Sequence, residues 1–596
     1  MYIILQKYYY LTCRIVIETF IVTTITKLSG DSISDIMAKD SVGVIYGRTG
    51  SFTFEFAVPE HVVVKRGEYI KVWHDIDGWT LAQVDGVMRM SDTFQLKQAI
   101  DAAEGARTGS VNEKTTAKAS VIGFRGTDRL LRTPKTPFSP GDKVFRADEE
   151  IITYTLGLIA GDVYLGLLDG QKVRVYLNGD DLVQKHVSVL AKTGSGKSYT
   201  AAVILEELLD NGIPMLIIDP HGEYLTLKQP NDDDDKKVFN KYKIVPKGYE
   251  RQVTVYTPAD KRINPDADRL FRLNETNLTT SDLSQLLVED QTQNQTAILY
   301  EAINKLKAED CNYSVEDIIL ELGQNKSKSK WNLISAIERI KETGLFSKKP
   351  TRLEELIKPG HASIIDMKGV DPDIQSMIVA KMCTELFEAR KLGKIPPCML
   401  VIEEAHNFCP ERGFNKTVST EILRTIASEG RKFGLGLLVI SQRPARVDKN
   451  VLSQCNTQII MKVTNANDLK ALSSGLEGLS SGLEEEIKRL PAGVAMIVSN
   501  KIERPILVDV RVRKSKHGGT SAAIERGFSY IEDAPPDEHT IEVLERNSVD
   551  EAATEKDMVP EILVNPRKDV NDDVYIEMPE KRKEKSLFKK IFGSSK

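Results

Sequence analysis

Apolar and polar residues follow two different patterns along the chain. From residue 43 to about residue 178, short runs such as Phe52–Ala57 and Tyr69–Trp73 alternate apolar with polar positions, and turns bearing glycine or proline separate them. From residue 182 onward, short apolar runs recur between longer stretches of helical period. The first pattern is typical of half-exposed strands, and the second of buried parallel strands covered by helices. These patterns predict a multidomain chain in which a small β-barrel or sandwich precedes an α/β domain.

The apolar runs of the α/β domain define its expected sheet, and they lie at Val187–Leu190, Met215–Asp219, Ala362–Asp366, Met399–Glu403 and Gly436–Ser441. Residues 270–358 interrupt them with amphipathic stretches of helical period. The expected helices there are Asp282–Leu287, Gln295–Leu306, Val315–Leu322 and Trp331–Thr343. A further polar helix, at residues 96–104, is expected within the stretch of sequence that forms the barrel. The expected domains are a barrel at residues 37–178, an α/β core at residues 179–270 and 360–515, and a helical insertion at residues 271–359.

Both ends of the chain lie outside these patterns. Residues 1–36 form an extension whose apolar stretch is interrupted by Arg14 and Glu18, and a charge at the centre of a bilayer costs roughly 2.5–3.5 kcal/mol. We therefore expect no membrane span, and Met37 reads as the start of the first domain. Residues 516–596 form a C-terminal extension. Its basic end, Lys581–Phe592, is either a docking helix or a solvated tail.

Bulk composition narrows the class of protein only slightly. The 596 residues carry a formal net charge of −5, so any nucleic-acid contact has to come from a local basic surface. The six cysteines include no CxxC pair, which argues against a zinc site or a disulfide framework and favours a reducing, cytoplasmic location.

A glycine-rich loop between an apolar strand and a helix carries the strongest chemical signal. Gly194 and Gly196 allow the backbone to turn its amides toward an anion, which the helix N-terminus also attracts. Lys197 can then reach the β- and γ-phosphates of ATP, and the Ser198 hydroxyl can bind Mg²⁺. The alternative is a plain glycine turn before an ordinary helix. The expected nucleotide-binding residues are Thr193, Gly194, Ser195, Gly196, Lys197, Ser198 and Tyr199.

A pair of carboxylates ends one of the buried strands. By analogy with other P-loop enzymes, Glu403 would hold Mg²⁺ or its water, and Glu404 would orient the water that attacks the γ-phosphate. Glutamate replaces the usual aspartate at position 403, which weakens its metal assignment. The alternative is a pair of exposed acids at a strand end.

Three further residues are expected to assist hydrolysis. Asp219, at the end of a strand expected to neighbour the P-loop strand, could bind a water molecule or simply build a turn. Gln442 could sense the γ-phosphate or cap its strand. Arg431, like Arg424, could act as an arginine finger in a neighbouring subunit or stabilise a helix end.

These motifs, in this order, resemble the HerA family of archaeal DNA translocases within the HerA/FtsK group. The resemblance covers roughly residues 40–520 and rests on segments such as Asp219–Tyr224, Ile402–His406 and Ser441–Pro444. It implies a RecA-like P-loop ATPase core, a homohexameric ring that threads double-stranded DNA, and a partnership with the NurA nuclease in DNA end resection. By the same resemblance Lys185, His517 and Gly518 are expected near the nucleotide, although related sequences tend to have arginine at position 185.

The leading hypothesis is therefore an ATP-driven motor on duplex DNA, with sequence-independent grip on phosphates. Residues 408–415 are one candidate for a pore loop, with Arg412 and Lys416 as contacts, or they form an ordinary surface loop. Two alternatives remain open. One is a conjugation- or secretion-type motor that moves protein across a membrane, and the other is a nucleotide-dependent docking platform without motor activity.

Overall fold

The computed structural model describes residues 41–105, 112–126, 128–158, 161–276, 278–280, 283, 293–309, 312–414, 417–475 and 481–518. The expected extension at residues 1–36, the docking segment Lys581–Phe592, the pore-loop residue Lys416 and, apart from Leu283, the helix Asp282–Leu287 lie outside these residues. Among the helices that the structure does describe, none has both the length and the apolar character needed to cross a bilayer.

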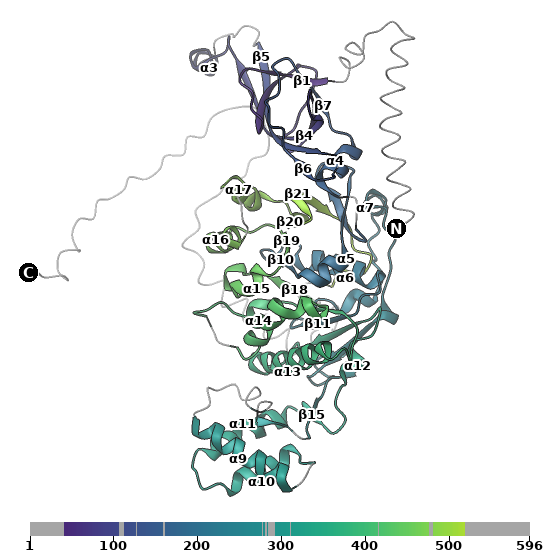
Figure 1. Cartoon of the computed structure of the whole chain (residues 1–596), viewed down its shortest axis with the longest axis vertical. Helices are drawn as coiled ribbons and strands as arrows, with labels where there is room; N and C mark the ends of the chain where they lie inside the picture. The colour runs from purple at the N-terminus through teal and green to yellow at the C-terminus, as the bar shows by residue number, and fades with distance from the viewer. Residues whose placement is uncertain are drawn as a thin grey trace, which may run out of the picture. The chain divides into compact units, whose positions relative to one another are not determined.

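Six antiparallel strands near the start of the chain close into a barrel (Figure 1). The strands are β1 (Ser41–Tyr46), β2 (Thr53–Val58), β3 (Tyr69–His74), β4 (Gly78–Ser91), β5 (Glu113–Arg125) and β7 (Lys143–Arg146). They follow the order β2-β1-β7-β3-β4-β5, and pairing of β2 with β5 closes the ring. Alternate residues such as Phe54, Phe56 and Val72 fill the interior, which confirms the alternating pattern as a barrel. The expected polar helix is α3 (Leu96–Ala103).

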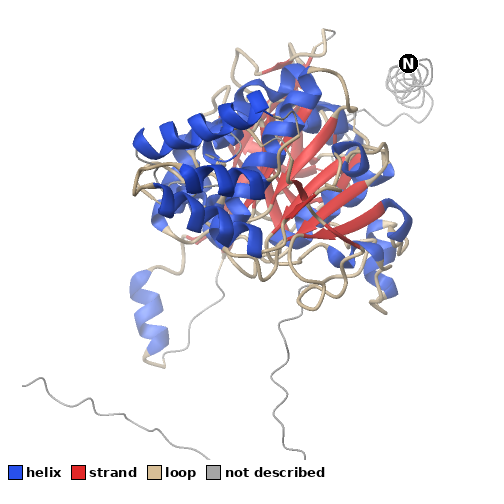
Figure 2. Cartoon of the chain, turned by 90° about the horizontal axis from the view of Figure 1, so that it is seen from below, coloured by secondary structure: helices blue, strands red, loops and turns tan. Residues whose placement is uncertain are grey.

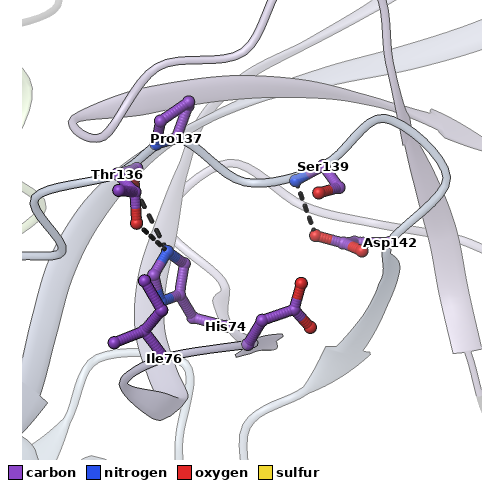
Figure 3. A pocket seen from close by; sticks show the side chains of 7 residues that line it. His74, Ile76, Thr136, Pro137, Ser139 and Asp142 are labelled. Atoms are coloured by element: carbon purple, nitrogen blue, oxygen red, sulfur yellow. Dashed lines mark hydrogen bonds between the residues drawn. The ribbon is translucent and has the colours of Figure 1, made fainter.

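A small pocket of about 210 Å³ opens at one end of the barrel (Figure 3). His74 lies in it, with its Nε2 atom 3.0 Å from the Thr136 hydroxyl, and the Ser139 amide donates to Asp142 at 2.8 Å. Its volume is below the roughly 300 Å³ at which small-molecule sites begin. Hydrogen bonds within the barrel engage His74, Thr136 and Asp142.

A twelve-stranded sheet forms the centre of the second domain, in the order β13-β12-β16-β11-β17-β18-β10-β19-β20-β21-β8-β9. Neighbouring strands from β13 to β19 are parallel, and those from β19 to β9 are antiparallel. The strands are β8 (Val163–Leu168), β9 (Arg174–Leu177), β10 (Val187–Leu190), β11 (Met215–Asp219), β12 (Val253–Thr257), β13 (Arg269–Leu270), β16 (Ala362–Asp366), β17 (Cys398–Ile402), β18 (Leu435–Ser441), β19 (Thr457–Ile460), β20 (Val494–Ser499) and β21 (Ile502–Val510).

Two expectations about these strands are wrong. The run that includes Arg174–Leu177 belongs to the large sheet and not to the barrel, because β8 pairs with β21 across the domain. The strand that ends at Asp219 does not neighbour the P-loop strand β10, since β17 and β18 lie between them. Alternation and strand length identify a strand, but its partners depend on chain crossovers that the local pattern does not contain.

Helices cover both faces of the large sheet (Figure 2). One buried cluster joins Ile217, Val401 and Leu438 to α6 (Lys197–Asp210), and the other joins Ile218, Leu400 and Leu437 to helices of the opposite face. The latter helices include α13 (Pro372–Lys391) and α14 (Thr420–Glu429). Further α-helices of the described residues are α4 (Glu149–Leu156), α5 (Gly179–Lys185), α7 (Lys236–Tyr242), α12 (Leu353–Leu356), α15 (Lys449–Ser453), α16 (Ala466–Gly475) and α17 (Ser481–Arg489).

The interruption between β12 and β16 forms a helical insertion. It contains α9 (Gln293–Glu309), α10 (Val315–Gln324) and α11 (Lys330–Glu342), with the short strands β14 (Leu273–Asn274) and β15 (Phe346–Ser347). Buried residues at helical spacing, among them Leu299, Ile318 and Ile337, pack the three helices together. The insertion therefore has the amphipathic pattern that the sequence indicated.

Candidate nucleotide site

The P-loop lies between the end of β10 and the start of α6. Gly194 and Gly196 have φ angles of 78° and 99°, which residues with a Cβ atom rarely adopt. A Cβ atom at position 196 would also lie 3.2 Å from the Cε atom of Met461. The Ser195 hydroxyl donates to the Lys192 carbonyl at 2.6 Å and fixes the loop from inside. The two glycines are thus required by the conformation of the loop.

Lys197, the first residue of α6, reaches the carboxylates that follow β17. Its ammonium group forms an ion pair with Glu403, 206 positions away, and lies 3.3 Å from Oε1 of Glu404. Only 5% of the Lys197 side chain is exposed. Burial alone lowers the pKa of a lysine, but the two carboxylates outweigh it and raise the pKa of Lys197, so this group stays charged.

Glu403 is fully buried and is held from two sides. Lys197 contacts its Oε1 atom, and the Tyr224 hydroxyl donates to Oε2 at 2.5 Å. Burial raises the pKa of Glu403, and its two donors oppose the shift. Sequence reasoning missed Tyr224, which ends the Asp219–Tyr224 motif. Its signal was present, because a tyrosine buried after a strand needs a partner for its hydroxyl.

Glu404 has a backbone conformation that is unusual for a residue with a side chain. Its φ and ψ angles are 49° and 48°, in the left-handed region, and its carbonyl accepts from the Asn407 amide at 2.8 Å. The strand therefore turns sharply and directs the Glu404 carboxylate toward the P-loop. Strained residues of this kind are concentrated at functional sites.

Gln442, which follows β18, connects Glu404 to the P-loop. Its amide nitrogen donates to Oε1 of Glu404, and its amide oxygen accepts from the Thr193 hydroxyl. His406 completes the surroundings of Glu404, with its Nδ1 atom 3.3 Å from Oε2 of Glu404 and 3.1 Å from the Ser441 hydroxyl. The structure thus brings Thr193, Lys197, Glu403, Glu404 and Gln442 into one cleft.

Asp219 is buried, and its carboxylate serves its own turn. It accepts from the backbone amides of Gly222 at 2.9 Å and Tyr224 at 3.0 Å. The neighbouring strand places Asp366 beside it in register, and burial raises the pKa of Asp219 and raises that of Asp366 to about 6. Asp219 therefore shapes the loop that delivers Tyr224 to Glu403.

Comparison with known proteins identifies the family of this domain. Residues 163–386 match the family model described as the central domain of the helicase HerA. A probable helicase of Methanocaldococcus jannaschii is 28% identical over 508 residues, which cover 80% of this chain and 92% of that protein. The DNA double-strand break repair helicase HerA of Pyrococcus furiosus is 26% identical over 532 residues, covering 80% of this chain and 94% of that protein. Residues 163–386 form a HerA central domain, and the similarity to a HerA helicase extends over 80% of the chain.

The family assignment confirms the resemblance drawn from the motifs. Among solved structures, the chain is similar to VirB4 of Thermoanaerobacter pseudethanolicus, with a TM-score of 0.44 and 16% identity over 59% of this chain and 97% of that one. The parallel sheet with its P-loop helix is the RecA-like core expected of a HerA protein.

Lys185 and the candidate arginine finger Arg431 lie away from the cleft. Lys185 ends α5, pairs with Asp181 at 2.6 Å, and precedes β10. Arg431 is exposed and precedes β18. The P-loop and Gln442 follow those same strands, and the seven residues of β18 span about 20 Å. Lys185 and Arg431 therefore lie at the edge of the sheet opposite the P-loop.

The other HerA-type residues lie beside the first turn of α6. The Tyr199 ring contacts the His517 ring at a centroid distance of 5.4 Å, and its hydroxyl accepts from the Arg513 amide at 2.9 Å. Gly518 lies close to Thr226. The segment after β21 thus returns to the helix that begins with Lys197.

A buried ion network attaches this returning segment to α6, and sequence reasoning missed it. The Arg511 guanidinium donates to Glu206 at 2.9 Å and to Glu207 at 2.7 Å, and Lys514 also contacts Glu207. Arg511 and Glu206 are both completely buried. Glu206 and Glu207 occupy the apolar face of a helix, where carboxylates need partners.

The structure also shows the surroundings of Arg424 and of Arg412 in the candidate pore loop. Arg424 donates to Asp448 at 2.9 Å from its Nε atom, so this guanidinium is occupied by carboxylates of its own chain. Arg412 is exposed, as a pore-loop contact or an ordinary surface residue would be.

Proposed function

We propose that this HerA-family chain is an ATP-driven motor that moves along double-stranded DNA as a hexameric ring and, with a nuclease of the NurA type, resects DNA ends during double-strand-break repair. One observation carries the proposal: Lys197 and Glu404 come from distant segments and meet at 3.3 Å in a P-loop cleft. Relatives named as DNA double-strand break repair helicases support the choice of DNA as the track.

The residues of the cleft supply the chemistry of phosphoryl transfer. The P-loop amides and Lys197 hold the β- and γ-phosphates, and Lys197 exchanges its carboxylate partners for phosphate oxygens. Glu404 then orients and deprotonates the attacking water, and Gln442 lies where it can respond to the γ-phosphate. Asp219 supports the reaction indirectly, through the loop that holds Tyr224.

Mg²⁺ fits the oxygen donors of this cleft. The Ser198 hydroxyl is half-buried and has no hydrogen-bond partner among the described residues, and Glu403 offers a carboxylate once Lys197 turns to phosphate. Hydroxyl, carboxylate and phosphate oxygens are the ligands that Mg²⁺ prefers. The ion neutralises charge that develops on the phosphates.

A ring would complete the site. Lys185 and Arg431 lie at the opposite edge of the sheet from the P-loop, and we infer that they serve a nucleotide bound to a neighbouring subunit. The exposed position of Arg431 suits that role. A homo-oligomer of this kind places one subunit's amino edge against the next subunit's cleft, and the hexamer is the arrangement that the family resemblance implies.

The test measures ATP hydrolysis with and without linear duplex DNA for the wild type and Glu404→Gln. We expect DNA to stimulate the wild type, with a stimulation that falls steeply as salt rises. Glu404→Gln should lower kcat by about 10²- to 10⁴-fold and retain ATP binding. Glu250→Gln, which alters an exposed glutamate outside the cleft, is the matched control.

Each alternative function has its own outcome. Wild-type hydrolysis that is identical with and without DNA contradicts a DNA motor and favours a motor with another substrate. ATP binding without hydrolysis in the wild type supports a docking platform. Full activity in Glu404→Gln contradicts the role given to this carboxylate.

A further inference from the structure

Glu404 is engaged by the protein on the side that faces the P-loop. Its Oε1 atom accepts from the Gln442 amide and lies 3.3 Å from the Lys197 ammonium. Its Oε2 atom is buried and has no hydrogen-bond donor among the described residues, and the Nδ1 atom of His406 lies 3.3 Å from it. The oxygen of Glu404 that faces the P-loop is therefore occupied by protein donors, while Oε2 lies enclosed beside His406.

The direction of each hydrogen bond in this chain follows from the chemistry of the groups. An ionised carboxylate only accepts hydrogen bonds, so the Gln442 nitrogen has to face Glu404. The Gln442 oxygen therefore faces Thr193, and the Thr193 hydroxyl has to donate. The Thr193 proton thus fixes the orientation of the amide that restrains Glu404.

We propose that Thr193 is a positioning residue that restrains Glu404 through Gln442 in competition with a triphosphate bound to the P-loop, so that part of the ATP-bound population stays restrained until DNA binds. This inference rests on the proposed ATPase function and deepens it. Thr193 belongs to the loop that surrounds the phosphates, and a charged phosphate oxygen is a stronger acceptor than a neutral amide oxygen. When Thr193 donates to phosphate and Lys197 moves to it, Gln442 loses its fixed orientation and Glu404 is released to bind water.

The test compares Thr193→Val, which keeps the shape and removes the hydroxyl, with Thr193→Ser, which keeps the hydroxyl. Steady-state kcat and KM for ATP are measured with and without linear duplex DNA. Thr193→Val should raise the kcat measured without DNA by about two- to tenfold, the effect of one hydrogen bond, and lower the ratio of DNA-stimulated to basal rate. Thr193→Ser should restore both wild-type values.

Ser195→Ala is the matched control, because the Ser195 hydroxyl bonds to the carbonyls of Lys192 and Lys462 and not to Gln442. It should change the rates with and without DNA by the same factor. A Thr193→Val variant whose basal kcat is unchanged or lower overturns the proposal, as does a rise in KM alone. A wild type that DNA does not stimulate contradicts the DNA motor, while the comparison of basal kcat values still decides the role of Thr193.

Discussion

Charged side chains at the two edges of the central sheet differ in burial and in their partners, as Lys197 and Arg431 show. At the carboxyl edge, Lys197, Glu403 and Glu404 are buried and contact one another. At the amino edge, Arg431 is exposed, and no hydrogen bond or ion pair engages its side chain among the described residues. The same strands supply both edges. The difference in burial therefore depends on the side chains at each edge and on their partners, and not on the arrangement of the strands alone.

This difference indicates which parts of the reaction one chain can supply. The carboxyl edge has its own acceptors and donors, and burial keeps them in place without a ligand. The Arg431 guanidinium has no acceptor among the described residues of its own chain, and long cationic side chains gain little from staying ordered in water. An acceptor from another molecule would give it a function.

The largest expected effect is a loss of kcat, and rings that mix two variants show whether the two edges act in one site. Arg431→Ala should lower kcat by about 10³-fold or more and leave ATP binding intact, because an arginine finger stabilises the transition state and not the bound nucleotide. Glu404→Gln should be equally inactive for a different reason. Rings assembled from both variants should regain part of the activity, since some interfaces combine a wild-type Glu404 with a wild-type Arg431.

Steady-state ATPase assays over a series of mixing ratios measure this recovery. Arg424→Ala is the control, because Arg424 is bound to Asp448 in its own chain and its loss should not be complemented by Glu404→Gln. Mixtures that are never more active than either variant alone contradict a role for Arg431 in a neighbouring site.

The sequence predicted the carboxyl edge better than the amino edge for a physical reason. The P-loop is a contiguous segment whose glycines and lysine are required by local conformation and charge, and Glu403 and Glu404 stand at the end of an apolar strand. Parallel strands bring their carboxyl ends to one side, so these two motifs had to meet. The family of the whole core followed from the same motifs.

What could not be predicted depends on contacts between distant segments. Tyr224 and the pair Arg511–Glu206 look like ordinary residues in the sequence, because their partners lie 179 and 305 positions away. The order of strands β11, β17 and β18 depends on chain crossovers, and the neighbour assigned to Asp219 was therefore wrong. Periodicity identifies elements, and packing decides which of them meet.

The second effect concerns the stability of α6, the helix that begins at the carboxyl edge. Arg511→Ala should lower the free energy of unfolding of the ATPase domain by about 3–5 kcal/mol, because it leaves Glu206 and Glu207 buried beside an unfilled space. Chemical denaturation followed by circular dichroism measures the change. Arg262→Ala, which removes an exposed partner of Asp260, should cause no resolvable loss, and equal losses in both variants would contradict the importance of burial.

The smallest expected effect is a dependence of stability on pH, which arises from a histidine at the amino edge. His186 is buried beside Arg431, and its Nδ1 atom accepts from the Leu437 amide at 3.0 Å. Burial, assisted by the charge of Arg431, lowers the pKa of His186 to about 4 from its ordinary 6.5. Below pH 6.5 the unfolded chain binds a proton that the folded chain refuses. The contribution of His186 to stability is therefore complete above pH 6.5 and is lost as the pH falls toward 4.

This loss should amount to about 3 kcal/mol for His186 in the wild type. His186→Asn keeps an acceptor for the Leu437 amide and removes the titration, so its stability should fall less between pH 6.5 and 4 than that of the wild type. His61→Asn, at an exposed histidine of the barrel, should leave the wild-type profile unchanged. Denaturant midpoints measured at several pH values give the comparison. If stability falls equally with pH in the wild type and in His186→Asn, the folded protein accepts a charged histidine at the amino edge. The two edges would then differ only in the solvent exposure of their side chains.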